Sequence, residues 1–75
     1  MITIYSKPNC QACRMTKMVL DDLGVDYTHI DVTTDAEALD KVKTLGYSQM
    51  PVVEADGEFW SGFQPDRLAE LVGGK

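Results

Sequence analysis

Two cysteines, Cys10 and Cys13, are the residues of this chain best suited to do chemistry. They follow a β-branched run at 2–5 and lead into an amphipathic segment. Residues three apart in the first turn of a helix lie on one face, so the two sulfur atoms could form a disulfide with little backbone movement. The unpaired N–H groups and the dipole of a helix start also favour a thiolate. The pair therefore predicts a redox dithiol of the thioredoxin-like kind.

Disulfide exchange requires an accessible thiolate and a second thiol that resolves the mixed disulfide. We expect Cys10, just before the helix, to be the nucleophile, with a pKa lowered below ~8.5. Cys13, one turn further along, is then the more shielded resolving thiol. A purely structural role is disfavoured because a Cys10–Cys13 bridge closes too small a loop to restrict the unfolded chain.

Metal binding is the competing interpretation of two cysteines at this spacing. Zinc takes three or four protein ligands. The only histidine, His29, is predicted in a strand away from the dithiol, so we predict no metal site within the chain. Zinc shared between two chains and a plain buried cysteine pair remain alternatives.

Length and composition restrict the class of protein. Seventy-five residues predict a single domain, 1–75. Two cysteines are too few for a secreted disulfide framework, and there is no leader or apolar run long enough to span a bilayer. We therefore expect a cytoplasmic protein without membrane contact, and a monomer.

The net charge of -5 argues against nucleic-acid binding, but the charge is unevenly distributed. The first acidic residue is Asp21, whereas Lys7, Arg14, Lys17 and the amino terminus precede it. The dithiol is therefore predicted to lie in the positive part of an acidic chain. These charges are either an ordinary solvated helix face or a field that favours the thiolate and attracts acidic partners.

The hydrophobic periodicity predicts the order β-α-β-α-β-β-α, a four-stranded mixed sheet with three helices, which is the smallest thioredoxin-like architecture. Strands are expected at 2–5, 25–32, 52–55 and 58–61. Helices are expected at 11–23, after a capping box that begins at Thr34, and from Pro65 onward. Gly24 and Gly46 should end the first two helices, and Asp56-Gly57 should form a hairpin turn.

Each predicted helix has an apolar stripe that we expect to be buried. The first stripe is centred on Ala12, Met15, Val19 and Leu23, with Thr16 and Leu20 widening it. The second comprises Ala38, Leu39, Val42 and Leu45, and the third comprises Leu68, Leu71 and Val72. Residues 73–75 are expected to form a frayed tail.

Met50-Pro51 precedes a strand that should lie beside the dithiol. In the thioredoxin fold a cis-proline occupies this place, and the sequence resembles that arrangement. A cis bond would leave the backbone of Met50 free to pair with an extended substrate segment, and would keep metals from the dithiol. A trans proline at the start of a strand is the alternative.

Trp60 is the only tryptophan of the chain. Alternation along the strand should turn one of Phe59 and Trp60 toward the core and the other outward, without deciding which. An exposed Trp60 close to a redox site would indicate docking of a partner.

Three stretches, 4–10, 45–53 and 60–66, resemble the NrdH-redoxins, which are glutaredoxin-like proteins with thioredoxin-like behaviour. The likeness extends over about 2–72, and its most distinctive part is Trp60-Ser61-Gly62-Phe63-Gln64-Pro65-Asp66. By this resemblance Cys10 and Cys13 are the redox dithiol, Pro51 is the cis-proline, and 60–65 is the signature loop.

The resemblance implies an electron carrier. Such proteins accept electrons from thioredoxin reductase, which draws on NADPH, and pass them to the catalytic subunit of class Ib ribonucleotide reductase. They use NADPH only indirectly, so no bound cofactor is expected. The residues expected to contact partners are Lys7, Gln11, Ala12, Met50, Pro51, Trp60, Ser61, Gly62, Phe63 and Gln64.

Two departures from the family pattern leave alternatives open. Gln11-Ala12 replaces the usual Val-Gln between the cysteines, which bears on redox potential and partner preference. Gln64 replaces an arginine, so a loop network built on that guanidinium would be weaker or rearranged. The alternatives are a glutathione-dependent glutaredoxin, whose glutathione carboxylate Lys7 could bind, and a non-enzymatic metal-handling dithiol module.

Overall fold

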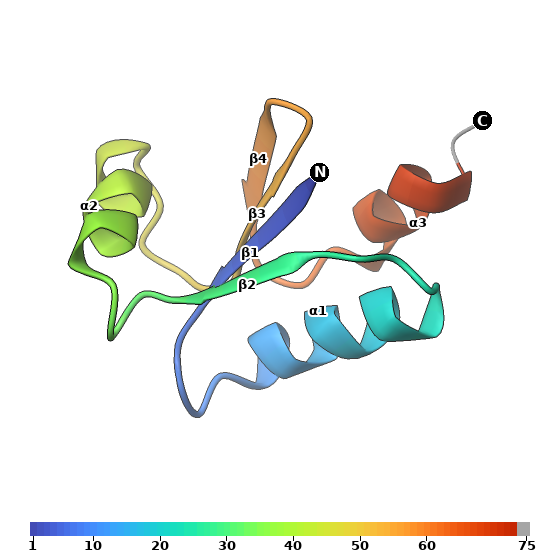
Figure 1. Cartoon of the computed structure of the whole chain (residues 1–75), viewed down its shortest axis with the longest axis horizontal. Coiled ribbons are helices and arrows are strands. Elements are labelled where there is room, and N and C mark those ends of the chain that lie inside the picture. Colours follow the sequence, from blue (N-terminus) through green and yellow to red (C-terminus); the bar gives the residue numbers. More distant parts are fainter. Residues whose placement is uncertain (74–75) are drawn as a thin grey trace.

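A four-stranded mixed sheet with helices on both faces forms the fold of the computed structural model, which describes residues 1–73 (Figure 1). The strands are β1 (Ile2–Ser6), β2 (Thr28–Asp31), β3 (Val52–Ala55) and β4 (Glu58–Ser61), and the helices are α1 (Gln11–Asp22), α2 (Ala36–Thr44) and α3 (Pro65–Gly73). The strand order is β2-β1-β3-β4, with β1 parallel to β2 and antiparallel to β3. The predicted thioredoxin-like architecture is confirmed.

Two apolar cores lie on opposite faces of the sheet. Alternation along β1 sends Ile2 and Ile4 to one face and Tyr5 to the other. The first face packs against α1 and α3 through Leu20 and Leu68, both fully buried, while α2 covers the second face (Figure 1). The central strand is therefore covered on both sides, which fixes the position of the segment that leaves its carboxyl end.

The buried stripe of α1 differs from the predicted one. Cys13, Thr16 and Leu20 are its buried residues, whereas Met15 and Leu23 are both 39% exposed. Thr16 can lie in the core because its hydroxyl donates a hydrogen bond of 2.8 Å to the Ala12 carbonyl, so the hydroxyl itself is not left unsatisfied. The stripe therefore includes Thr16 and Leu20, as the periodicity predicts, but it is centred on them instead of on Met15 and Leu23.

The second strand is shorter than predicted, because its first residues complete the end of α1. The N–H of Gly24 donates to the carbonyl of Asp21, and that of Val25 donates to the carbonyl of Leu20, which is the Schellman pattern. The N–H of Val25 is thus bonded to the helix and cannot pair with a strand, and pairing with β1 starts only at Thr28. Gly24, with a φ of 71°, has the predicted role of helix terminator.

Similar small corrections apply elsewhere. Leu45 is 43% exposed instead of buried, since it is the C-cap residue of α2 and lies beyond its packed turns. Helix α3 includes Gly73, which was expected in a frayed tail; residues 74–75 and the side chain of Val72 lie outside the described part of the chain. The Asp56-Gly57 turn is confirmed, with positive φ at both residues as a type I′ hairpin requires.

Trp60 belongs to the core rather than to the surface. Its side chain is 5% exposed and packs with the first core, while Phe59 is half-buried against the second. Because both faces of the sheet are covered, neither ring points freely into solvent. The expectation that the Trp60 ring contacts a partner is therefore wrong, and the alternative of a core tryptophan is confirmed.

The N-cap of α2 is Asp35 and not the predicted Thr34. An Asp35 carboxylate oxygen accepts a hydrogen bond of 3.1 Å from the Ala38 N–H. The Thr34 hydroxyl instead donates to the Asp31 carbonyl at 3.2 Å, so it is directed toward the preceding turn. The helix consequently begins one residue later than the capping-box pattern indicates.

Removing this cap should cost stability. We expect Asp35→Ala to lower the free energy of unfolding by about 1 kcal/mol, the usual cost of losing an N-cap. Thr34→Ala is the matched control and should cost less, because that hydroxyl caps no helix. Urea unfolding of the two variants measures the difference, and a larger loss for Thr34→Ala would contradict the assignment.

Candidate active site

Cys10 is the N-cap residue of α1, with φ −112° and ψ 107°. Its sulfur accepts a hydrogen bond of 3.2 Å from the N–H of Cys13, and its carbonyl accepts one of 3.1 Å from the N–H of Arg14. Asn9 makes the turn into the helix with a φ of 59°, a conformation that asparagine tolerates better than most residues. The helix start therefore presents an N–H group directly to the first sulfur.

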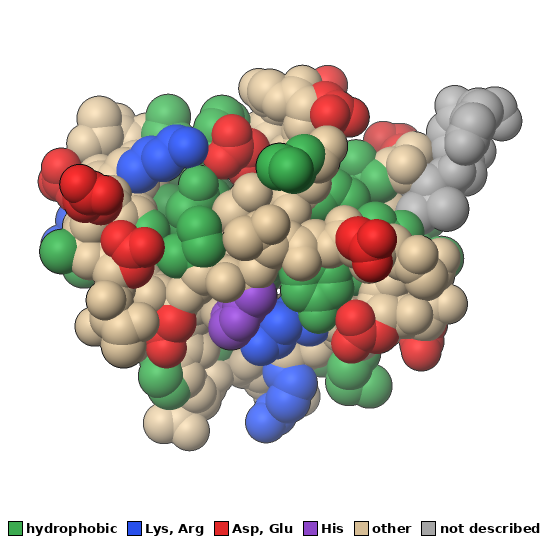
Figure 2. Space-filling model, in the orientation of Figure 1, with side chains coloured by type: hydrophobic (Ala, Val, Ile, Leu, Met, Phe, Trp, Pro, Cys, Tyr) green, Lys and Arg blue, Asp and Glu red, His purple; other side chains and the backbone are tan. Residues whose placement is uncertain are grey.

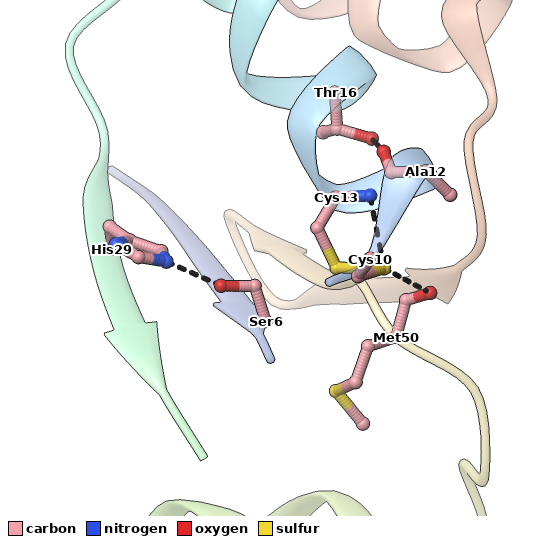
Figure 3. The surroundings of a disulfide bond; sticks show 7 residues. All are labelled: Ser6, Cys10, Ala12, Cys13, Thr16, His29 and Met50. Atoms are coloured by element: carbon pink, nitrogen blue, oxygen red, sulfur yellow. Dashed lines mark hydrogen bonds between the residues drawn. A yellow bond between two sulfur atoms is a disulfide. The ribbon is translucent and has the colours of Figure 1, made fainter. Parts of the chain in front are cut away.

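The two cysteines form a disulfide, with Cα atoms 5.2 Å apart (Figure 3). Cys10 is half-buried, whereas Cys13 is 2% exposed and faces the core side of α1. Cys10 is thus the more exposed of the two cysteines, as predicted for the nucleophile, and Cys13 is the more buried, as predicted for the resolving thiol.

The segment at Met50 lies against the disulfide. The Met50–Pro51 peptide bond is cis, as predicted, and the Met50 carbonyl oxygen lies 3.6 Å from Cys10 Sγ (Figure 3). Pro51 is fully buried, and its carbonyl accepts a hydrogen bond of 2.9 Å from the N–H of Gly62. The structure therefore brings Cys10, Met50, Pro51 and Gly62 into one continuous set of contacts.

The loop at 61–64 is closed by its own hydrogen bonds. Gln64 Nε2 donates to the Ser61 carbonyl at 2.9 Å, and the Gln64 carbonyl accepts from the N–H groups of Arg67 and Leu68 in the first turn of α3. Phe63 is half-buried against the first core. Gln64, which stands where arginine is usual, thus uses its neutral amide to tie the loop to itself.

Sequence reasoning missed a pair of polar residues next to the dithiol loop. The Ser6 hydroxyl and His29 Nε2 are hydrogen-bonded between β1 and β2, and Ser6 is 2% exposed (Figure 3). Burial and the nearby charge of Lys17 lower the pKa of His29, while Asp31 acts in the opposite direction. In a neutral ring, Nε2 can accept a hydrogen bond from the serine hydroxyl. Parallel pairing of these two strands was the signal that could have placed the two residues together.

The positive region is smaller than predicted. The amino terminus forms an ion pair of 3.3 Å with Asp56, at the end of β1 remote from the dithiol, so it does not contribute there. Lys7, Gln11 and Arg14 are exposed, and Ala12 is half-buried. Within residues 1–73, no three His, Cys, Asp or Glu side chains are grouped so that they could hold a metal ion.

Comparison with known proteins decides the family. A glutaredoxin family profile matches residues 2–60. The glutaredoxin-like protein NrdH of Escherichia coli (strain K12) is 39% identical over 70 residues, which cover 93% of this chain and 86% of that one. The NrdH protein of Lactococcus lactis subsp. cremoris (strain MG1363) is 37% identical over 72 residues, covering 96% of this chain and 100% of that one. This chain belongs to the NrdH family.

The fold agrees with the NrdH assignment. The structure of NrdH-redoxin from Escherichia coli, described as having a thioredoxin-like activity profile, matches with a TM-score of 0.91 at 38% identity, over 93% of this chain and 92% of that one. The NrdH resemblance is thus confirmed, and with it the prediction of a thiol–disulfide oxidoreductase that carries the Cys10–Cys13 pair. None of the helices in the described part of this NrdH chain has the length and apolar character required to cross a membrane.

The lowered pKa of His29 can be measured directly, because the chain has a single histidine whose NMR signal needs no assignment. We expect a pKa below the ordinary value of about 6.5. Lys17→Gln should raise it by removing a repelling charge, and Asp31→Asn should lower it further. A native pKa at or above the ordinary value would contradict the assignment.

The same shift makes stability depend on pH with a definite sign. The unfolded chain binds the His29 proton more readily than the folded one, so the contribution of this group is fully present above about pH 6.5. It is lost as the pH falls through the folded-state pKa. The unfolding free energy of His29→Gln should therefore lack this part of the pH dependence.

Proposed function

We propose that this NrdH-family protein carries electrons from thioredoxin reductase to the catalytic subunit of class Ib ribonucleotide reductase. In this function Cys10 is the nucleophile and Cys13 the resolving thiol. The observation that carries the assignment of roles is the contrast between the two cysteines. Cys10 is accessible and receives the Cys13 N–H at 3.2 Å, whereas Cys13 is almost completely buried.

The reaction is a pair of disulfide exchanges. The Cys10 thiolate attacks one sulfur of the partner's disulfide, a Cys10–partner bond forms, and the other partner sulfur leaves as a thiolate. The Cys13 thiol then loses its proton and attacks Cys10 Sγ, which forms the internal disulfide and releases the second partner sulfur. Two electrons have passed to the partner, and the reductase returns two from NADPH, so the chain itself requires no bound cofactor.

The backbone beside Cys10 supplies a place for the partner. The Met50 carbonyl oxygen, 3.6 Å from Cys10 Sγ, is free of any backbone pairing within the sheet, since β3 begins at Val52. An extended partner segment that donates an N–H to this carbonyl would hold its disulfide against Cys10. Gln11 and Ala12 follow Cys10 in the chain, and the loop 61–64 is joined to Pro51 through Gly62, so we expect both to contribute to the contact surface.

Thioredoxin reductase is favoured as the electron donor by family membership and by the thioredoxin-like activity profile described for the Escherichia coli relative. The test is NADPH oxidation with a protein disulfide as acceptor, comparing thioredoxin reductase with glutathione plus glutathione reductase. We expect turnover with thioredoxin reductase and at least about tenfold less with glutathione, a difference in barrier of roughly 1.4 kcal/mol. Turnover only with glutathione would refute the proposal and support a glutathione-dependent glutaredoxin.

The roles of the two cysteines are tested by single serine variants. Cys13→Ser should trap a mixed disulfide with the catalytic subunit of class Ib ribonucleotide reductase, because the resolving thiol is gone. Cys10→Ser should form no adduct and show no turnover. Non-reducing mass spectrometry after alkylation detects the adduct, and normal turnover by Cys13→Ser would overturn the assignment.

A further inference from the structure

Charge is strongly segregated along the chain. Residues 1–20 contain three basic side chains and no acidic one, and the remaining 55 residues contain four basic and twelve acidic ones. The three basic residues are Lys7, which precedes the cysteines, and Arg14 and Lys17, which follow them on α1. Positive charge is therefore concentrated around the dithiol of an otherwise acidic protein.

The three basic side chains form no ion pair in the described part of the chain, although Lys17 lies near enough to Asp31 to help lower the pKa of that carboxyl. Among residues 1–73, Lys41, Arg67 and the amino terminus each form an ion pair with a carboxylate. In the same part of the chain Lys7, Arg14 and Lys17 form none. Figure 2 shows Lys and Arg side chains beside the single histidine in the region of α1, while separate acidic side chains and a further basic one are scattered over the rest of this face.

Exposed methionines accompany the cations on α1. Met15 is 39% exposed and Met18 is 58% exposed. Spacings of three and four residues make Met18 a neighbour of both Met15 and Arg14 on the helix surface. Methionine side chains are flexible and polarisable, so they adapt to apolar groups of varied shape. The outer surface of α1 thus combines positive charge with adaptable apolar area.

We propose that this surface, formed by Arg14, Met15, Lys17 and Met18, binds an acidic peptide segment that carries an apolar side chain and flanks the disulfide of the electron acceptor. The proposal rests on the function proposed above and adds the chemistry of the partner. Because Cys10 caps the same helix, residues that flank a disulfide bound at its sulfur can extend over α1.

The dimensions suit a short segment. A rise of 1.5 Å per residue places Lys17 about 10 Å along the axis from Cys10, a distance that three or four extended residues span. Carboxylates at those positions would meet Arg14 and Lys17 at close range, where salt of physiological strength screens the attraction only in part. Electrostatic attraction of this kind mainly raises the rate of association.

The experiment uses two peptides of equal length, each with one internal disulfide and one leucine. One peptide has glutamates and the other has lysines at the third and fourth residues from the cystine. The protein is reduced with dithiothreitol, freed of it and mixed with each peptide. Samples are quenched with acid, and chromatographic separation of the reduced from the oxidised peptide gives the second-order rate. We expect the acidic peptide to react on the order of tenfold faster at low salt. The advantage should largely disappear at about 0.5 M salt.

Matched charge reversals locate the effect. Lys17→Glu should reduce the preference for the acidic peptide several-fold. Lys43→Glu, the same change at an exposed residue of α2 on the other face of the sheet, should preserve it. Rates are expressed relative to a small neutral disulfide, which corrects for any change in Cys10 reactivity.

Two results would overturn the proposal. One is equal rates of the two peptides with the unmodified protein at low salt, a comparison that depends on no variant folding correctly. The other is an equal effect of Lys17→Glu and Lys43→Glu. Because this assay contains no reductase, failure of thioredoxin reductase to reduce the protein would refute the proposed function and leave the peptide preference measurable.

Discussion

The hydrogen bond from the Cys13 N–H to Cys10 Sγ is the interaction on which the active site depends, because one sulfur serves both the fold and the chemistry. As an N-cap it satisfies a backbone donor that the helix cannot satisfy itself. As a reacting atom it faces the partial positive charge of that N–H group, which stabilises a thiolate. The same contact sets the start of α1, and with it the burial of Cys13 one turn later.

Packing on both faces of the sheet fixes the position of this helix start. Strand β1 is covered on one face by α1 and α3 and on the other by α2, so its carboxyl end has a fixed position. On the α2 side, Lys41 lies 5.7 Å from the ring centre of Tyr5 and 5.8 Å from that of Phe59, and pairs with Glu54 at 3.2 Å. Such contacts extend the packing of α2 beyond its short apolar stripe. The dithiol therefore follows, after a short loop, a strand that is covered on both faces.

The fold and the reacting atoms were largely predictable from sequence, because each depended on local signals. The glycines at 24 and 46, the Asp56-Gly57 turn and the cysteine spacing all act through backbone geometry within a few residues. Two of the corrections depended on where a side chain makes its hydrogen bond. Thr16 lies at the centre of the α1 stripe and not at its edge, with its hydroxyl bonded to the Ala12 carbonyl. Asp35 replaces Thr34 as the N-cap because the Thr34 hydroxyl bonds to the preceding turn. The Ser6–His29 pair depended on tertiary pairing, which no local pattern encodes.

The ion pair between the amino terminus and Asp56 has a practical consequence. The five residues of β1 separate this terminus from the dithiol loop by about 13 Å of extended strand. Both members of the pair are largely exposed, so replacing the terminal ammonium by a peptide bond would cost little folding stability. The amino end is therefore a suitable attachment point for a fused fluorescent protein or a surface anchor, which would leave the approach to Cys10 open and make the domain usable as an immobilised disulfide reductant.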